Sequence, residues 1–336
     1  MTSVLIDNKM LAKNKLYILA VSGGPDSLFL LEKMCLGGYN LAVAHVNYKK
    51  RKNSDYDEKI VKNYCQKYSL PCEIYQVQNS EYNSVSNFQD RARQIRYNFF
   101  QKLAVKYQTK YIVVAHHRDD HRETYLLQKQ KKSLVEYWGL PARTKHGKCW
   151  ILRPLLSLSK EQICQYLIEN KIDYAVDTTN QLPIYQRNII RQQIANLTPE
   201  QKVLLDKEIE KKNRELKKIK KIVRTTASQL IIHSPRMPFI SHSILKLVKK
   251  NKYEPEIFLR LLYFWINRAT GGILHQRKKK LLCEVYKQLF ISPKTNLIIE
   301  LGNDFQIVKT PNQAHIVAKK YINNYNNERP TTSKKK

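Results

Sequence analysis

Two short polar stretches of this chain carry residue types that could do chemistry. The first is Ser22-Gly-Gly-Pro-Asp-Ser27 and the second is His116-His-Arg-Asp-Asp-His-Arg-Glu-Thr124. Glycines lack a Cβ atom, so the backbone of the first stretch can approach a ligand closely. Carboxylates such as those of the second stretch can bind an ammonium group and accept a proton from it. The pair suggests an anion-binding turn combined with acid–base side chains.

The first stretch lies between an expected strand and an expected helix. Residues 16–21 form an apolar run with Tyr, Ile and Val, which predicts a buried strand. Asp26 and Ser27 can cap a helix whose apolar positions are Leu28, Leu30 and Leu31. A strand, a glycine turn and a helix start direct free backbone N–H groups toward one point, where a phosphate can bind. No Lys follows the glycines, so this is not a Walker loop.

The second stretch follows another apolar run, residues 110–116. His117 and His121 stand four residues apart, a spacing that would suit zinc on a helix. The H-E-x-x-H motif is absent, however, and Asp119 and Asp120 compete nearby, which disfavours zinc. The plainer alternative is a polar helix cap followed by a surface turn.

Apolar runs alternate with helical patterns over the first half of the chain. Strands are expected at residues 16–21, 41–47, 72–77 and 110–116, and helices at 54–69, 88–107 and from about 119. This alternation predicts an α/β fold, a parallel sheet with helices on both faces. Ligands bind beyond the carboxyl ends of the strands in such sheets. Residues 22–27, 45–47 and 116–123 should therefore meet at one edge.

The second half is more basic and less regular. Residues 129–148 are expected to form a loop or irregular helix over the site, and 199–226 a long Lys-rich helix that either serves as a solvated linker or contacts nucleic acid. Further helices are expected at 241–250, 255–269 and 275–290, then a hairpin at 295–300 and 305–308 with a third strand at 314–317. We predict a catalytic domain at 1–195, a basic helical linker at 196–235, a small α+β domain at 236–320 and a disordered basic tail at 321–336.

Composition points to a polyanionic partner. The net charge is +32 in 336 residues, which favours nucleic acid. The six cysteines contain no C-x-x-C pair and no zinc spacing, so we expect reduced, buried thiols. No run reaches about 18 apolar residues, and the N-terminus has no signal-peptide pattern, so we expect a cytoplasmic protein with no membrane span.

Both stretches resemble known signatures. The first is similar to the S-G-G-x-D-S loop of the N-type ATP pyrophosphatases, or PP-loop enzymes, and the second to the A-H-H-x-D-D-x-x-E-T signature of the tRNA(Ile)-lysidine synthetase family. Further similarity lies at residues 44–51, 92–97, 153–156 and 177–191. The chain departs from that family at 48–50, where Tyr-Lys-Lys replaces His-Gly-Leu, at Gln89, which replaces Glu, and at 129–135, which replace a glycine-rich run.

The resemblance implies a ligase that uses ATP and Mg²⁺ to join free lysine to C2 of the wobble cytidine of a CAU-anticodon tRNA(Ile), through an adenylated cytidine. The product, lysidine, changes the tRNA's codon and amino-acid specificity from Met to Ile. The resemblance also implies tRNA binding by the small second domain and, by family analogy, a homodimer. It assigns ATP binding to Ser22, Gly23, Gly24, Pro25, Asp26, Ser27, His45 and Asn47, with Asp26 also holding Mg²⁺.

The remaining assignments divide between catalysis and substrate binding. We expect catalysis from Asp26, Asp120, Glu123 and Arg93. We expect substrate or tRNA contacts from Arg96, Asp119, Arg187, Asn188 and Arg191. Arg93 and Arg96 stand three residues apart and so share one helix face, although a generic basic face would look the same.

Two other functions stay open at this point. A PP-loop tRNA thiolase usually needs a persulfide-forming cysteine or a cysteine-ligated cluster, and no cysteine pair here is spaced for one. A non-catalytic nucleotide- or RNA-binding module would fit if the altered lysine-rich loop had disabled the chemistry.

Overall fold

The computed structural model describes residues 6–49, 54–81, 88–175, 186–230, 239–241, 255–270, 278–309, 311 and 313–319. Two compact units divide the chain. The first comprises Met1–Gln130 and Tyr137–Ile209, and the second comprises Lys131–Glu136 and Glu210–Lys336. The predicted helix at 241–250 lies almost wholly outside the described residues, as do the similarity at 177–185 and the tail at 321–336. The predicted domain boundaries stay a prediction.

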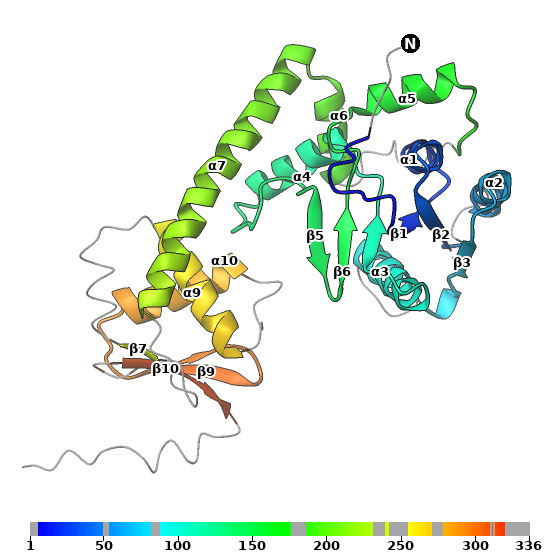
Figure 1. Ribbon diagram of the computed structural model, residues 1–336. Coiled ribbons are helices and arrows are strands. Elements are labelled where there is room, and N and C mark those ends of the chain that lie inside the picture. Colours follow the sequence, from blue (N-terminus) through cyan, green and yellow to red (C-terminus); the bar gives the residue numbers. More distant parts are fainter. Residues whose placement is uncertain are drawn as a thin grey trace, which may run out of the picture. The chain divides into compact units, whose positions relative to one another are not determined.

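A six-stranded sheet organises the first unit (Figure 1). Its order is β3-β2-β1-β4-β6-β5, with β1 at Leu16–Ala20, β2 at Asn40–Asn47, β3 at Cys72–Gln76, β4 at Tyr111–Val113, β5 at Arg143–His146 and β6 at Cys149–Leu152. Every neighbouring pair is parallel except β5 with β6. The structure therefore confirms the predicted α/β fold with a parallel sheet.

Helices cover both faces of this sheet. The apolar core on one face includes side chains of α1 (Pro25–Leu36), α2 (Ser54–Lys67) and α5 (Lys160–Glu169), and that on the other includes side chains of α3 (Phe88–Lys106). In β1, Tyr17 and Leu19 join the first core and Ile18 joins the second. Successive side chains of a strand point to opposite faces, so a strand covered on both sides is continuously apolar.

The predicted loop at 129–148 is wrong in part. Helix α4 extends over Arg118–Gln130, and β5 then pairs antiparallel with β6 as a hairpin around Gly147, whose φ is +57°. Strand β5 is polar and mostly exposed, so it lacks the apolar alternation from which a strand is predicted. Strand β4 is also shorter than the predicted 110–116, because regular pairing ends at Val113.

Two helices complete the chain's first unit. Helix α6 (Gln186–Ala195) packs on α4, and α7 (Pro199–Leu230) begins here and continues into the second unit. The predicted helix at 199–226 is confirmed. Within the described residues, none of the helices is both long and apolar enough to cross a membrane.

The second unit has its own antiparallel sheet. Its order is β7-β10-β9-β8, with β7 at Phe239–Ser241, β8 at Leu297–Glu300, β9 at Phe305–Lys309 and β10 at Gln313–Ala318. Helices α9 (Pro255–Thr270) and α10 (Lys278–Tyr286), with a π-helical turn at Lys287–Ile291, complete the unit. Its buried core includes Leu262, Trp265, Ile266, Leu282, Val285 and Ile307. The predicted α+β domain and three strands are confirmed, whereas β7 was not predicted.

Candidate active site

The glycine turn joins β1 to α1 and is held by its own hydroxyl groups. The Ser27 hydroxyl donates to the Gly24 carbonyl at 2.9 Å and accepts from the Ser22 backbone N–H at 3.1 Å. Gly23 has a φ of +88°, and a Cβ atom there would lie 3.0 Å from the Asp57 carbonyl oxygen. Gly24 is the N-cap of α1 and Pro25 follows it, so the predicted capping by Asp26 or Ser27 is wrong. The turn leaves the positive end of α1 beside the site.

A cavity of about 750 Å³ opens beside this turn. It gathers eight residues that the sequence singled out: Ser22, Gly24, Pro25, Asp26, Asp119, Asp120, Glu123 and Arg191. It is also lined by His117, which the sequence offered only as a possible zinc ligand, and by residues that the sequence did not single out, among them Asp57, Lys160, Glu161, Cys164 and Lys202. The loop and the second polar stretch, far apart in sequence, therefore face the same space.

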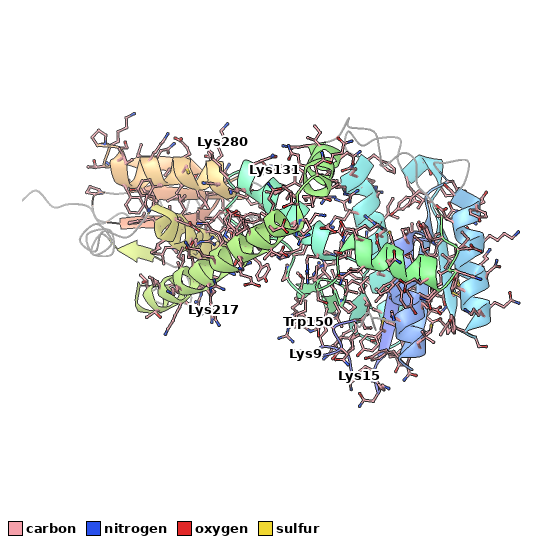
Figure 2. All side chains as sticks on the ribbon, turned by 90° about the horizontal axis from the view of Figure 1, so that it is seen from above. Lys9, Lys15, Lys131, Trp150, Lys217 and Lys280 are labelled. Atoms are coloured by element: carbon pink, nitrogen blue, oxygen red, sulfur yellow. The ribbon has the colours of Figure 1, made fainter. Side chains whose placement is uncertain are left out.

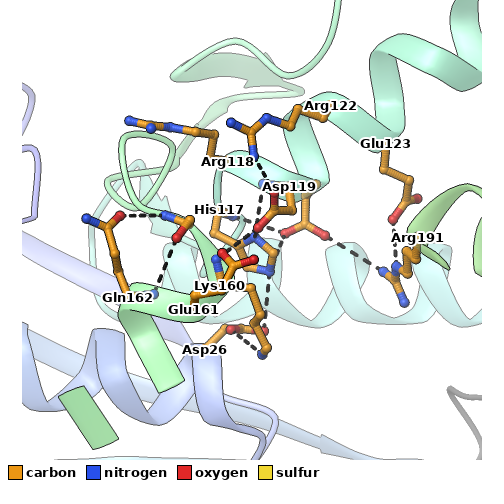
Figure 3. A network of polar contacts seen from close by, with 12 residues as sticks. Asp26, His117, Arg118, Asp119, Arg122, Glu123, Lys160, Glu161, Gln162 and Arg191 are labelled. Atoms are coloured by element: carbon orange, nitrogen blue, oxygen red, sulfur yellow. Dashed lines mark hydrogen bonds and ion pairs between the residues drawn. The ribbon is translucent and has the colours of Figure 1, made fainter. Parts of the chain in front are cut away.

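His117 lies between two carboxylates of this cavity (Figure 3). Its Nε2 atom is 3.7 Å from Oδ2 of Asp26 and 3.4 Å from Oδ2 of Asp120. The Asp120 carboxylate also accepts the His117 backbone N–H at 3.0 Å. Burial raises the pKa of Asp120, but His117, His116, this N–H and Arg191 outweigh burial and hold that pKa below its usual range. Asp120 is therefore a carboxylate at neutral pH.

Asp119 is engaged on both of its carboxylate oxygens. Oδ1 accepts from Nη1 of Arg122 at 2.6 Å, and Oδ2 accepts the backbone N–H of Lys160 at 2.9 Å. The Arg122 guanidinium is buried, with a side chain 3 % exposed, and makes two further hydrogen bonds to the Asp206 carboxylate. Asp119 therefore connects α4 to the start of α5, in addition to lining the cavity.

Glu123 is a buried carboxylate that binds two arginines of α6. Its Oε2 atom accepts from Nε of Arg191 at 2.7 Å, and its Oε1 atom lies 3.0 Å from Nε of Arg187. Nη2 of Arg191 also lies 3.7 Å from Oδ1 of Asp120. Two arginines predicted to bind ATP or tRNA thus meet a predicted catalytic acid, while Asn188 of the same helix is buried.

Comparison with known proteins shows to which family the chain belongs. The sequence pattern of the PP-loop domain family matches residues 3–198. Over 316 residues the chain is 38% identical to the tRNA(Ile)-lysidine synthase of Mycoplasma mycoides subsp. mycoides, covering 91% of this chain and 74% of that protein. This chain belongs to the tRNA(Ile)-lysidine synthase family. The tRNA(Ile)-lysidine synthase of Mesoplasma florum is 32% identical over 310 residues, which cover 91% of this chain and 74% of that protein. The tRNA(Ile)-lysidine synthase of Ureaplasma parvum is 36% identical over 251 residues, which cover 74% of this chain and 69% of that protein.

A solved structure shares the fold. The U34-tRNA thiolase NcsA from Methanococcus maripaludis superposes with a TM-score of 0.51 at 17% sequence identity, over 62% of this chain and 74% of that one. At this identity the match supports the PP-loop fold and says nothing about the reaction.

The cavity lining leaves out eight predicted residues: Gly23, Ser27, His45, Asn47, Arg93, Arg96, Arg187 and Asn188. Nδ1 of His45 hydrogen-bonds the Val21 carbonyl at 2.9 Å, and its Nε2 atom is buried without a partner among the described residues. The Asn47 amide donates to Asp55 at 2.9 Å and to Glu58 at 2.8 Å. Asn47 therefore fixes the start of α2 to the end of β2, and its predicted contact with ATP stays a prediction.

Arg93 and Arg96 lie on α3. The Arg93 guanidinium carbon is 4.7 Å from the centroid of the Tyr97 ring, and Arg96 hydrogen-bonds Tyr48. Both arginines act electrostatically on His116, whose pKa is lowered to about 4, chiefly by burial and further by Arg153, Arg93 and Arg96. These arginines thus lie near the second polar stretch but outside the cavity lining, and their predicted roles stay predictions.

Gly139 lies after α4, just beyond residues 129–135, the stretch that replaces a glycine-rich run. Gly139 has a φ of +77°, and a Cβ atom there would lie 2.5 Å from Cε1 of His121. Nδ1 of His121 accepts the Leu140 backbone N–H at 2.8 Å. His121 therefore fixes the segment that follows α4. In the part of the chain that the structure describes, no group of three or more His, Cys, Asp or Glu is arranged to hold a metal ion.

Sequence reasoning missed the cations that face the carboxylates. Lys160 places its ammonium nitrogen 2.5 Å from Oδ1 of Asp26, and Lys202 lies 2.8 Å from Oε1 of Glu161. Neither lysine stands in a recognisable local pattern, since each partner comes from a different element. The only local signal is the Ser159 capping box, which sets the first residue of α5 at Lys160.

Proposed function

We propose that this protein is an ATP-dependent ligase that forms lysidine on tRNA(Ile), as the names of its relatives imply. The observation that carries the proposal is the shared cavity. There the glycine turn at the positive end of α1 faces Asp120 across a space large enough for substrate groups. The finer assignments, which are the wobble cytidine of a CAU anticodon, free lysine and Mg²⁺, are part of the same proposal.

The reaction needs two steps because the cytosine C2 oxygen is a poor leaving group. In the first, this oxygen attacks the α-phosphorus of ATP, a new O–P bond forms, and the α–β bridging bond breaks to release pyrophosphate. In the second, the ε-amine of lysine attacks C2, the C2–O bond breaks and AMP leaves. The backbone N–H groups of the turn, with the N-terminus of α1, stabilise the charge that develops on the departing pyrophosphate.

The second step needs a proton acceptor. The ε-ammonium of lysine has a pKa of about 10.4, so only about one molecule in 2,500 is neutral at pH 7. Asp120 suits this task because it is a carboxylate that lines the cavity, and a carboxylate can both bind the ammonium and take its proton. Glu123 suits it less, because both of its oxygens already face arginines. We therefore assign proton transfer to Asp120 and the positioning of Arg191 to Glu123.

Mg²⁺ fits this donor set. In nucleotide sites Mg²⁺ takes one or two carboxylates and completes its shell with phosphate oxygens and water. Asp26 and Asp120 both approach Nε2 of His117, so two carboxylates lie close together beside the glycine turn. We propose Asp26 as the principal ligand. When bound, the ion would neutralise charge on the polyphosphate.

The tRNA partner is supported by charge. The chain has a net charge of +32, and exposed lysines such as Lys9, Lys217 and Lys280 extend from the ribbon into solvent (Figure 2). On α7 the exposed cations of the second unit include Lys211, Lys212, Lys217, Lys218, Lys221 and Arg224. Such cations bind phosphates without reading bases. The homodimer and the cytoplasmic location stay predictions.

One assay tests the function directly. Purified protein is incubated with ATP, isotopically labelled lysine and an unmodified CAU-anticodon tRNA, and the tRNA is digested for nucleoside analysis. We expect labelled lysidine together with AMP and pyrophosphate. Formation of ADP and orthophosphate would contradict the proposal, and turnover without tRNA or lysine would favour a different enzyme.

The alternatives have their own discriminating results. A thiolase would lose activity when all six cysteines are changed to serine, whereas we expect lysidine formation to survive. None of the six is in a disulfide, and the described residues hold no cluster of three that could ligate a metal centre. A non-catalytic module would bind nucleotide or RNA but release neither AMP nor pyrophosphate.

A further inference from the structure

Lys160 is the cation nearest to the carboxylate of the glycine turn. Its ammonium nitrogen lies 2.5 Å from Oδ1 of Asp26, across the cavity wall formed by the starts of α1 and α5 (Figure 3). The Lys160 side chain is 38 % exposed and that of Asp26 28 %, so both groups remain open to solvent and to a ligand. A half-exposed ion pair of this kind contributes little to folding stability.

The backbone that carries Lys160 is fixed. Its N–H donates to Oδ2 of Asp119, and the Ser159–Gln162 capping box closes the first turn of α5. Helix α5 packs against α1. There the rings of Tyr166 and Phe29 pack edge to face, with their centroids 5.1 Å apart. The backbone of Lys160 is therefore held in place at the cavity wall, and its ammonium group moves only by rotation about the bonds of the flexible side chain.

We propose that Lys160 exchanges partners during the reaction. Without nucleotide the Lys160 ammonium pairs with Asp26. With the magnesium complex of ATP bound, Asp26 would hold the metal ion and the Lys160 ammonium would bind the β- and γ-phosphates. Lys160 thus helps to hold the pyrophosphate as it leaves. This inference rests on the proposed function, because that function places a polyphosphate in this cavity.

Charge at this point of the cavity supports the exchange. Mg²⁺ carries two charges and prefers hard oxygen ligands, so it competes with an ammonium for Asp26. The displaced ammonium remains near the positive N-terminal end of α5, where an anion is favoured. The polyphosphate would thus lie between the N-termini of α1 and α5, with Lys160 as a side-chain cation facing the glycine turn.

Lys160→Met tests the exchange, with Lys106→Met as a matched control. Lys106 also lies 2.5 Å from a carboxylate, that of Glu73, but outside the cavity. Three affinities are measured on each variant. Mn²⁺ binding to nucleotide-free protein is measured by electron paramagnetic resonance, and binding of magnesium pyrophosphate and of AMP by calorimetry. Mn²⁺ serves as the probe for the divalent site.

The proposal predicts that Lys160→Met changes the affinities for pyrophosphate and for Mn²⁺ in opposite directions. Pyrophosphate binding should weaken at least tenfold, Mn²⁺ binding should tighten severalfold because its competitor is gone, and AMP binding should stay within twofold. Lys106→Met should change none of these affinities by more than twofold. Pyrophosphate binding within twofold of wild type would overturn the proposal, as would Mn²⁺ binding that weakens or stays unchanged. If Lys160→Met does not fold, Lys160→Gln is measured against the same limits.

Failure of this inference can be told from failure of the proposed function. If the wild-type protein forms lysidine and Lys160→Met binds pyrophosphate normally, only the role of Lys160 is wrong. If the wild type forms no lysidine but Lys160→Met shows the opposite changes, the polyphosphate contact stands and the assigned reaction is wrong.

Discussion

Nε of Arg191 donates to the buried carboxylate of Glu123 at 2.7 Å, although 68 residues separate the two in sequence. Arg187, one turn earlier on α6, lies 3.0 Å from the other oxygen of the same carboxylate. The Glu123 side chain is only 4 % exposed, whereas both arginines are about half exposed. The pair therefore fastens α6 to α4 at the wall of the cavity. The Glu123 carboxylate also neutralises part of the charge of the two arginines.

Arg191→Met should destabilise the protein, because Glu123 then keeps a single cation for a buried negative charge. Since Arg191 is half exposed, we expect about 1–2 kcal/mol, below the range for a fully buried pair. Urea unfolding measures the loss. Adding Glu123→Gln should restore most of it, since no buried charge then lacks its partner, and the two changes should be non-additive by about 1 kcal/mol. Purely additive losses would show that the ion pair is unimportant.

Asp120→Asn should reduce lysidine formation at least about 100-fold, the usual scale for removing a positioned acid–base group. The asparagine keeps the shape of the side chain but cannot accept the proton of the lysine ammonium. Adenylation of the tRNA, measured as pyrophosphate release in a single turnover, should fall much less. Asp206→Asn serves as the control, because Asp206 holds Arg122 from outside the cavity lining. Wild-type lysidine formation by Asp120→Asn would refute the assignment.

The free energy of unfolding should fall in acid because Glu58 becomes protonated. Burial raises the pKa of this carboxyl, but hydrogen bonds from Lys62, Asn47 and Gln76 outweigh burial and hold the pKa at about 2. A depressed folded-state pKa contributes stability above the unfolded value of about 4.3, and this contribution is lost as pH falls toward 2. The contribution is about 2–3 kcal/mol at neutral pH.

The acid dependence can be assigned with two variants. Glu58→Gln should flatten the decline in unfolding free energy between pH 5 and pH 2, measured by urea denaturation at each pH. Glu210→Gln is the control, because Glu210 makes an exposed pair with Arg214 on α7. An equal decline in wild type and Glu58→Gln would show that other groups carry the acid sensitivity.

Local patterns made part of this structure predictable. Strand β1 and the glycine turn could be predicted because a continuous apolar run and two adjacent glycines are signals within a few residues. Strand β5 could not, since its residues are polar and it is paired only with β6 at the sheet edge. The charge pairs could not either: Lys160 lies 134 residues from Asp26, and Arg122 lies 84 from Asp206. Such pairs depend on how helices pack against one another, and a local sequence pattern does not predict that packing.

Gly23 and Gly38 offer a matched test of the phosphate turn. Both have left-handed backbones, with φ of +88° and +69°. A Cβ atom at Gly38 would meet nothing within 4 Å, whereas one at Gly23 would lie 3.0 Å from the Asp57 carbonyl oxygen. The two alanine variants therefore share the backbone strain and differ in crowding at the turn.

Gly38→Ala should lower the free energy of unfolding by about 1 kcal/mol, the scale of a left-handed L-residue, and leave ATP binding unchanged. Gly23→Ala should lower it further, because either the turn or the start of α2 must move away. The displaced backbone N–H groups should then bind the polyphosphate at least about tenfold more weakly, since each such donor is aimed at a fixed point. Calorimetry with magnesium ATP and urea unfolding measure both effects. Equal ATP affinity in the two variants would show that the close contact between Gly23 and Asp57 does not shape the phosphate site.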